Sequence, residues 1–303
     1  MSDVQALIDR RERLLGPGNP LFYDDPVHLV RGEGVWLHDA DGRRYLDCYN
    51  NVPCVGHCHP RVVEALCAQA GTLNTHTRYL HENILDYAEH LLSKFDDSLD
   101  RVAIACTGSE ANDLAMRVAR VNTGANGFIC TNATYHGNTT AVGQLNSIFE
   151  PIGGYGEHIR MVSWPDSYRV SEGTTEEALA EHYASEVAAA VDSLKESGAG
   201  IAAMIVCPIF ANEGLPAVPA GYMNKAVDIV RQAGGLFIAD EVQSGFGRTG
   251  SWWGYEQYGI VPDIITLGKP MGAGHPISGI VARGVLLDNY RAHEMYFNTF
   301  GGN

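Results

Sequence analysis

Two short apolar runs, each followed by a charged side chain, constrain this chain more than any other feature. The first run, Leu236–Ala239, leads into Asp240, and the second, Ile264–Leu267, leads into Gly268 and Lys269. Runs this short and apolar are typical of strands buried inside a parallel α/β sheet. Ligands bind outside the carboxyl ends of such strands, so we predict one site that contains both Asp240 and Lys269.

A lysine and a carboxylate in this position suit one kind of cofactor chemistry. An amine that burial or a cationic neighbour keeps neutral forms a Schiff base with an aldehyde. A carboxylate beside a pyridine nitrogen keeps that nitrogen protonated, which makes the ring an electron sink. Together the two groups point to pyridoxal phosphate, although either one alone is more often an ordinary charged side chain.

The residues around both positions strengthen this interpretation. The strings FIADEVQSGFGRTG and PDIITLGKPMGAGHPI resemble the class-III pyridoxal-phosphate-dependent aminotransferases. The resemblance implies a fold-type-I α/β transferase with a mostly parallel central sheet flanked by helices. It also implies that Lys269 is the Schiff-base lysine, that Asp240 pairs with the ring nitrogen and that Gln243 contacts the ring hydroxyl.

Composition excludes several classes of partner. The formal net charge of −15 argues against nucleic acid and anionic membranes, because both attract a basic surface. The seven cysteines include no CxxC pair, no leading segment is of the signal-peptide type, and no run approaches the roughly 18 apolar residues of a membrane span. We expect a reduced, cytoplasmic protein that acts on small molecules.

The N-terminal part, residues 1–60, is expected to belong to a small domain, and residues 61–303 to the large cofactor-binding domain. Residues 27–51 alternate like short strands, with a turn at 39–42. The segment that follows contains four candidate metal ligands, Cys54, His57, Cys58 and His59. Because ligands so crowded lack the usual two-pair spacing, we favour no metal and a turn into a helix that starts near Pro60.

Strands and helices alternate from about residue 91 onward, which indicates a mostly parallel sheet. A helix is expected to open at Thr107, directly after a strand. Free amides at such a helix start bind phosphate, but Thr107 with Glu110 also forms a capping box, and these residues alone leave the two alternatives equal. The resemblance of TGSEAND to the family's phosphate-binding turn places the cofactor phosphate on Gly108 and Ser109. Strands are expected at 102–106, 128–130 and 201–206, helices at 107–120, 176–197 and 222–233, and surface loops at 153–175.

Tyr135 and His136 follow the strand expected at 128–130. An aromatic side chain at a strand end can lie flat on a cofactor ring, although a tyrosine in a polar loop is more often ordinary packing. The tripeptide YHG matches the family's stacking aromatic, so Tyr135 and His136 are candidate cofactor-binding residues.

The segment Cys207–Gly214 departs from the family. Many members resemble EPxQGEGG here, and their second glutamate pairs with an arginine that switches between substrates. In this chain Cys207 stands at the first acid and Asn212 at the second, with Glu213 displaced by one position. We therefore expect dicarboxylate acceptors such as 2-oxoglutarate to be handled poorly.

The last residues, NTFGGN, resemble a family turn whose threonine reaches the cofactor phosphate of the neighbouring subunit. This implies a homodimer with shared sites, in which Thr299 is a cofactor contact. The resemblance also implies a C-terminal part of the small domain that this chain does not include.

The predicted activity is transamination, from a primary amine or ω-amino acid to a 2-oxo acid such as pyruvate or glyoxylate. A phospho-lyase that acts on an amino-alcohol phosphate such as ethanolamine phosphate is the alternative, because YLDCYNNVPCVGHCHP and LNTHTRYLHENILDYAEHL resemble that branch of the family. A non-catalytic homologue is a third, weaker hypothesis.

Overall fold

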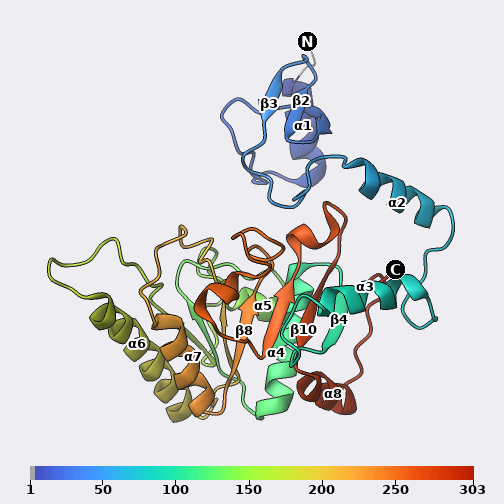
Figure 1. Cartoon of the computed structure of the whole chain (residues 1–303). Helices are drawn as coiled ribbons and strands as arrows, with labels where there is room; N and C mark the ends of the chain where they lie inside the picture. The colour runs from blue at the N-terminus through green and yellow to red at the C-terminus, as the bar shows by residue number, and fades with distance from the viewer. Residues whose placement is uncertain (1–3) are drawn as a thin grey trace. The chain divides into compact units, whose positions relative to one another are not determined.

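The computed structural model describes residues 4–303, which form two compact units (Figure 1). One unit extends to Leu73, and the other runs from Asn74 to Asn303. Helix α2 (Pro60–Ala70) therefore belongs to the first unit. The domain boundary expected after residue 60 stays a prediction.

The first unit contains the strand meander that the alternation of residues 27–51 predicts. Strands β1 (Leu29–Glu33), β2 (Trp36–Asp39) and β3 (Arg44–Leu46) pair antiparallel in that order, and helix α1 (Val4–Leu15) precedes them. Asp39 makes the predicted turn, because its Oδ1 accepts from the amides of Asp41 at 3.1 Å and Arg43 at 2.7 Å. Such side-chain bonds are the usual reason for aspartate in a tight turn.

The cysteine- and histidine-containing segment after the meander is a turn. Gly56 has a φ of +91°, and a Cβ there would lie 3.0 Å from the Cα of Gly34. His57 Nε2 lies 2.6 Å from Asp47 Oδ2, so its ring is tied to a carboxylate. The predicted helix start at Pro60 is confirmed. Within residues 4–303, no three histidine, cysteine or acidic side chains are grouped as a metal site.

The second unit is built on a seven-stranded sheet in the order β4-β10-β9-β8-β7-β5-β6. The pairs β9–β8, β8–β7, β7–β5 and β5–β6 are parallel, whereas β10 is antiparallel to both neighbours. The predicted mostly parallel sheet is confirmed. The strands are β4 (Arg101–Ala105), β5 (Phe128–Thr131), β6 (Ile159–Val162), β7 (Ala203–Val206), β8 (Leu236–Asp240), β9 (Ile264–Leu267) and β10 (Ser278–Ala282).

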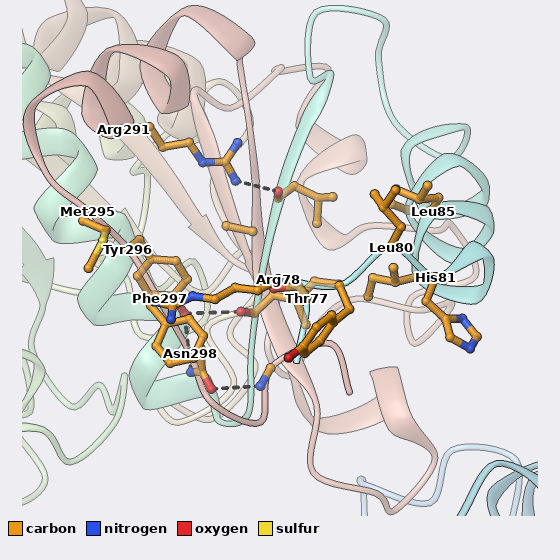
Figure 2. A pocket seen from close by; sticks show the side chains of 17 residues that line it. Thr77, Arg78, Leu80, His81, Leu85, Arg291, Met295, Tyr296, Phe297 and Asn298 are labelled. Atoms are coloured by element: carbon orange, nitrogen blue, oxygen red, sulfur yellow. Dashed lines mark hydrogen bonds between the residues drawn. The ribbon is translucent and has the colours of Figure 1, made fainter. Parts of the chain in front are cut away.

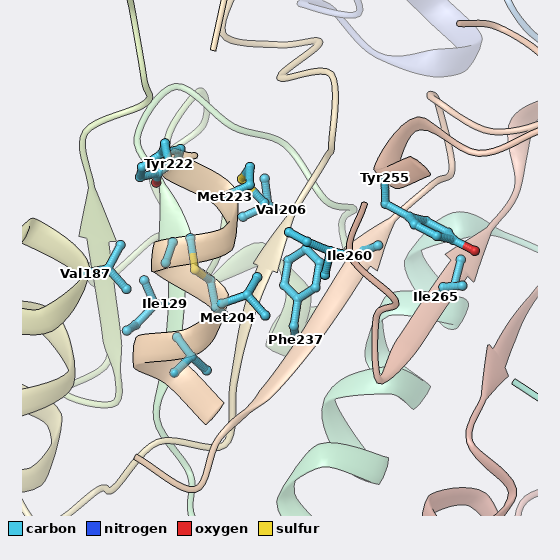
Figure 3. Close-up of a cluster of buried hydrophobic side chains, with 14 of the residues drawn as sticks. Ile129, Val187, Met204, Val206, Tyr222, Met223, Phe237, Tyr255, Ile260 and Ile265 are labelled. Carbon is cyan, nitrogen blue, oxygen red and sulfur yellow. The ribbon is translucent and has the colours of Figure 1, made fainter. Parts of the chain in front are cut away.

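Apolar side chains alternate between the two faces of this sheet, and helices cover both faces. Met204, Val206 and Phe237 pack against α6 (Glu176–Glu196) and α7 (Tyr222–Gln232) (Figure 3). Ile205 and Ile238 point to the opposite face, which α4 (Gly108–Thr123) and α8 (Gly284–His293) cover. Burial on both faces explains why the strands are continuous apolar runs. The remaining elements are α3 (Glu82–Leu92), α5 (Thr140–Gly143), η1 (Gly254–Tyr258) and η2 (Lys269–Gly272).

Two strands were not expected from the sequence. Strand β6 lies inside residues 153–175, where we predicted only surface loops, and this prediction is wrong. The strand has only four residues, and its burial does not alternate along the chain. Arg160 in the strand donates to Ser193 Oγ of α6 at 2.9 Å. Strand β10 has a glycine as its second residue: a Cβ on Gly279 would lie 2.6 Å from the carbonyl oxygen of Ala103. In the part of the chain that the structure describes, no helix has the length and apolarity to cross a membrane.

Candidate active site

The carboxyl ends of the central strands meet at one cavity of about 190 Å³. Asp240 is the last residue of β8 and lies opposite Thr266 of β9, and Lys269 follows β9 after one glycine. Seven of the eight predicted site residues line the cavity, and Thr299 does not. The lining residues are Gly108, Ser109, Tyr135, His136, Gly137, Cys207, Asn212, Asp240, Val242, Gln243 and Lys269.

Asp240 is the most tightly held group of the site. Its side chain is 6% exposed, and His136 Nδ1 lies 2.6 Å from Oδ2. Asn112 Nδ2 donates to the same oxygen at 3.0 Å, while the amide of Val242 donates to Oδ1 at 3.0 Å. Burial on its own would raise the pKa of Asp240, but His136 and the other donors outweigh it and hold the pKa below its ordinary value. Asp240 is therefore an anion fixed in orientation.

Lys269 is half-buried at the start of η2. Its Nζ donates to Gln243 Oε1 at 3.2 Å. Gln243 in turn sits three residues after Asp240, so one loop carries both predicted ring contacts. An amine and a carboxylate on neighbouring parallel strands thus face one cavity, as the two apolar runs predict.

The start of α4 satisfies the capping box and leaves room for a phosphate. Thr107 Oγ1 accepts from the amide of Glu110 at 3.1 Å, and Glu110 Oε2 accepts from the amide of Thr107 at 2.9 Å. The amides of Gly108 and Ser109 follow in the first turn, where helix amides lack intrahelical acceptors. The two alternatives are therefore compatible, because the capping box uses other donors than these two amides.

Tyr135 and His136 stand on the loop after β5, and Asn212 holds that loop. Asn212 Nδ2 donates to the carbonyl of Tyr135 at 3.3 Å. The Tyr135 ring is half-buried and meets Phe149 edge-on, with centroids 6.5 Å apart. His136 is fixed differently, because its amide donates to Asn146 Oδ1 at 2.9 Å and its ring faces Asp240.

Thr299 lies in an exposed turn away from this cavity. Asn298 organises the turn, since its Oδ1 accepts from the amides of Phe300 at 3.1 Å and Gly301 at 2.9 Å. Asn298 Nδ2 also donates to Glu110 Oε1 at 3.3 Å, which ties the turn to the start of α4. Within one chain Thr299 is thus not a member of the site.

Sequence reasoning missed three residues that shape the site: Asn112, Val242 and Gly137. Asn112 is fully buried in α4 and holds Asp240. Its signal was a polar side chain on the apolar face of a helix. Gly137 was part of the YHG string, and its role is close approach: a Cβ there would lie 2.6 Å from Ser109 Oγ.

The residues present fit pyridoxal phosphate. A Cβ on Gly108 would lie 2.8 Å from Val242 Cγ1, so the first turn of α4 packs against Val242 only because residue 108 is glycine. Beside this turn stand a lysine, a buried carboxylate, a glutamine and an aromatic ring, which are the groups that a phosphate-bearing pyridine aldehyde requires.

Comparison with known proteins identifies the family. The model of the class-III aminotransferases matches residues 23–303. The chain belongs to the class-III aminotransferase family. This confirms the resemblance of the two strings around Asp240 and Lys269, the α/β transferase fold, and membership of a group of pyridoxal-phosphate-dependent enzymes.

Several known proteins are similar to this chain over nearly its whole length. It is 38% identical to an alanine–glyoxylate aminotransferase 2-like protein of Drosophila melanogaster, over 98% of this chain and 62% of that protein. It is 35% identical to an ethanolamine-phosphate phospho-lyase homologue of Caenorhabditis elegans, over 99% of this chain and 67% of the relative. The chain thus spans about two thirds of the length of these relatives.

Solved structures of a phospholyase and of an ω-transaminase are also similar to this chain. A phospholyase from Arthrobacter, in complex with phosphoethanolamine, is 46% identical with a TM-score of 0.95, over 98% of this chain and 70% of that one. An ω-transaminase from Thermomicrobium roseum is 27% identical with a TM-score of 0.86, over 100% of this chain and 72% of that one.

Proposed function

We propose that the complete protein is a pyridoxal-phosphate-dependent phospho-lyase that acts on a small amino-alcohol phosphate such as phosphoethanolamine. The observation that carries this proposal is the 46% identity and TM-score of 0.95 to a phospholyase, against 27% and 0.86 for an ω-transaminase. This reverses the order of the two activities that the sequence predicts. The sequence alone favours transamination because that is the commoner reaction of the family.

The uncharged side chains at one border of the cavity support the same choice. Cys207 and Asn212 line the cavity where many members carry acids, and burial raises the pKa of the Cys207 thiol to about 12, so it stays neutral. A phospho-lyase needs no 2-oxo acid acceptor, and therefore no switch between two kinds of substrate.

Each lining residue receives one task in this proposal. When bound, pyridoxal phosphate supplies an aldehyde for amines and a pyridinium ring that draws electrons from the substrate carbon. Lys269 Nζ holds the cofactor and then takes the proton from the carbon that bears the substrate amine. Asp240 keeps the proton on the ring nitrogen, and Gly108 and Ser109 bind the cofactor phosphate. Tyr135 covers the ring.

The net reaction balances without an acceptor. Phosphoethanolamine loses the proton at the amine-bearing carbon, the neighbouring C–O bond breaks, and phosphate leaves with the bonding electrons. Addition of one water to the remaining enamine gives acetaldehyde and ammonia. The electron sink is used and restored in each turnover, so no 2-oxo acid is consumed.

Two parallel incubations of the complete protein test this proposal. One contains phosphoethanolamine alone and is scored for phosphate and ammonia, and the other contains an amine with pyruvate or glyoxylate and is scored for alanine or glycine. We expect acceptor-independent phosphate release and little amino acid. Amino acid formation without phosphate release would instead assign transamination, which the fruit-fly relative's name favours.

We also propose the predicted homodimer with shared sites. A second cavity, of about 400 Å³, lies between α3, β4 and the C-terminal segment, and includes Asn298 and Gly301 on either side of Thr299 (Figure 2). Large apolar side chains stand exposed around it, with Leu80 98% and Met295 81% accessible. A second copy of the chain would cover them. Sedimentation of the complete protein tests this, and an active monomer would refute it. The cytoplasmic location stays a prediction.

A further inference from the structure

The loop that follows β7, residues 207–215, borders the candidate site and has a strained backbone. Phe210 has a φ of +48° and Leu215 a φ of +57°, a region that bulky side chains rarely adopt. The amide of Leu215 donates to the carbonyl of Phe210 at 3.0 Å, and the amide of Phe210 donates to the carbonyl of Cys207 at 2.8 Å. The loop is therefore a closed turn, and contacts outside its own backbone must hold it in this conformation.

Two buried side chains provide such contacts. The ring of Phe210 is fully buried and belongs to the core cluster on the α6/α7 face of the sheet, which also contains Val206. Glu213 is buried as well, and the hydroxyl of Thr131 donates to its Oε1 at 2.5 Å. Burial of a phenylalanine ring gains more free energy than one left-handed residue costs, so the ring is able to hold the strained backbone.

Asn212 stands between these two buried side chains and is itself exposed. Its Nδ2 donates to the carbonyl of Tyr135 at 3.3 Å, and it lines the cavity together with Cys207. Cys207 is 4% exposed. Burial raises the pKa of its thiol to about 12, and the backbone amides of Ile209 and Ala211 act in the opposite direction, so the loop lies against the sulfur.

We propose that Phe210 is a positioning residue for this border of the cavity. Its ring holds the 207–215 loop over Cys207, and this keeps Asn212 against the carbonyl of Tyr135. Without the ring the strained turn relaxes and the border moves, while the groups at the ends of β8 and β9 stay in place. This role concerns the shape of the site and not the reaction, and its first test needs no substrate.

The reactivity of the Cys207 thiol reports whether the loop is closed. A buried, neutral thiol reacts slowly with a maleimide, whereas an exposed thiol regains its ordinary pKa and reacts faster. The complete protein without cofactor is labelled at one fixed pH, and peptide mapping gives the rate at each cysteine. Cys130 is the internal control, because it is fully buried in β5 and becomes accessible only when the sheet itself unfolds.

Phe210→Ala and Phe210→Gly remove the ring in two different ways. Alanine keeps the backbone strain, whereas glycine relieves it, because a left-handed φ costs glycine little. We expect both variants to raise the Cys207 rate by on the order of a hundredfold and to leave the Cys130 rate nearly unchanged, since loss of a buried phenylalanine ring shifts a local opening equilibrium by at least that much. Phe210→Leu retains an apolar anchor and should raise the Cys207 rate by a smaller factor.

Phe128→Ala is the matched control variant. The ring of Phe128 is also fully buried, but it stands on the first residue of β5, at the opposite end of the sheet from the loop. Its loss should lower the stability of the protein without a selective rise of the Cys207 rate over the Cys130 rate.

A wild-type Cys207 rate in Phe210→Gly would overturn the proposal, because the backbone alone would then hold the loop. A Cys207 rate that rises only in step with the Cys130 rate would overturn it as well. If the alanine and glycine variants do not fold, Phe210→Leu decides by the same comparison of the two thiols.

Kinetics separate positioning from a merely structural role, and this second measurement rests on the proposed phospho-lyase function. In Phe210→Leu the KM for phosphoethanolamine should rise by roughly two- to tenfold, as for one displaced hydrogen-bonding group, and kcat should change less. A fall in kcat at unchanged KM would contradict the positioning role. If the wild type releases no phosphate, the proposed function fails, while the labelling rates still decide the role of Phe210.

Discussion

Replacement of Gly108 by alanine tests whether the start of α4 is shaped for a phosphate. A Cβ on Gly108 would lie 2.8 Å from Val242 Cγ1 and 3.1 Å from Cγ2, which is closer than carbon atoms pack. Valine is stiff at χ1 and cannot easily turn both methyl groups away. Overpacking of this kind costs about 1–3 kcal/mol. We expect α4 to shift at its first turn and to displace the amides of Gly108 and Ser109.

The assays are thermal unfolding and cofactor retention during dialysis. A cost of about 1–3 kcal/mol lowers the melting temperature by several degrees and weakens retention by roughly 5- to 150-fold if the strain acts on the bound form. Gly143→Ala is the control, since that glycine is also helical and a Cβ there meets nothing within 4 Å. Val242→Ala should rescue Gly108→Ala. Retention equal to that of the control, or no rescue, would refute the reasoning.

Four other substitutions have defined outcomes. Lys269→Ala should keep cofactor binding through the phosphate turn but lose turnover, and borohydride reduction with peptide mapping should label Lys269 in the wild type and no other lysine. Asp240→Asn should lower the rate on the order of a hundredfold or more, because an amide cannot hold the ring nitrogen protonated; near-normal turnover would contradict this role. Thr299→Ala should weaken cofactor retention in the dimer without unfolding it, as sedimentation and absorbance will show. Glu241→Gln should lower the free energy of unfolding in urea by about 1–3 kcal/mol. Both carboxylate oxygens of Glu241 accept hydrogen bonds from backbone amides, of Gly254 at 2.9 Å and of Tyr255 at 2.8 Å, and the amide nitrogen of glutamine cannot accept one. An unchanged unfolding midpoint would show that these hydrogen bonds do not contribute to stability.

The site residues that the sequence predicts are those that directly follow a strand in the sequence. Asp240 and Lys269 each follow an apolar run, and the carboxyl ends of parallel strands necessarily share an edge of the sheet. The helix start at Gly108 and the tyrosine after β5 follow by the same rule. Their position at a strand end fixes where these residues lie, but the family resemblance was needed to assign Gly108, Ser109 and Tyr135 to the cofactor.

The supporting residues could not be predicted, because their partners are far away in the sequence. Asn112 reaches Asp240 across 128 positions, and Thr131 reaches Glu213 across 82. No local pattern distinguishes such a polar side chain from one that faces solvent. Strand β10 was not predicted for a related reason. Its small residues allow β10 to lie close to β4, and this contact exists only in the assembled sheet.

The glycines at 108 and 268 show how these two kinds of information combine. Each precedes a predicted site residue, Ser109 and Lys269, and the sequence places them 160 positions apart. In the fold both face Val242, because a Cβ on Gly268 would lie 3.0 Å from Val242 Cγ1 and 3.6 Å from the Cα of Gly108. The phosphate turn and the lysine turn therefore pack against each other, and the Val242 side chain contacts both. Both positions need a glycine, since a Cβ at either one would press on the same Val242 side chain, at 2.8 Å from Gly108 and 3.0 Å from Gly268.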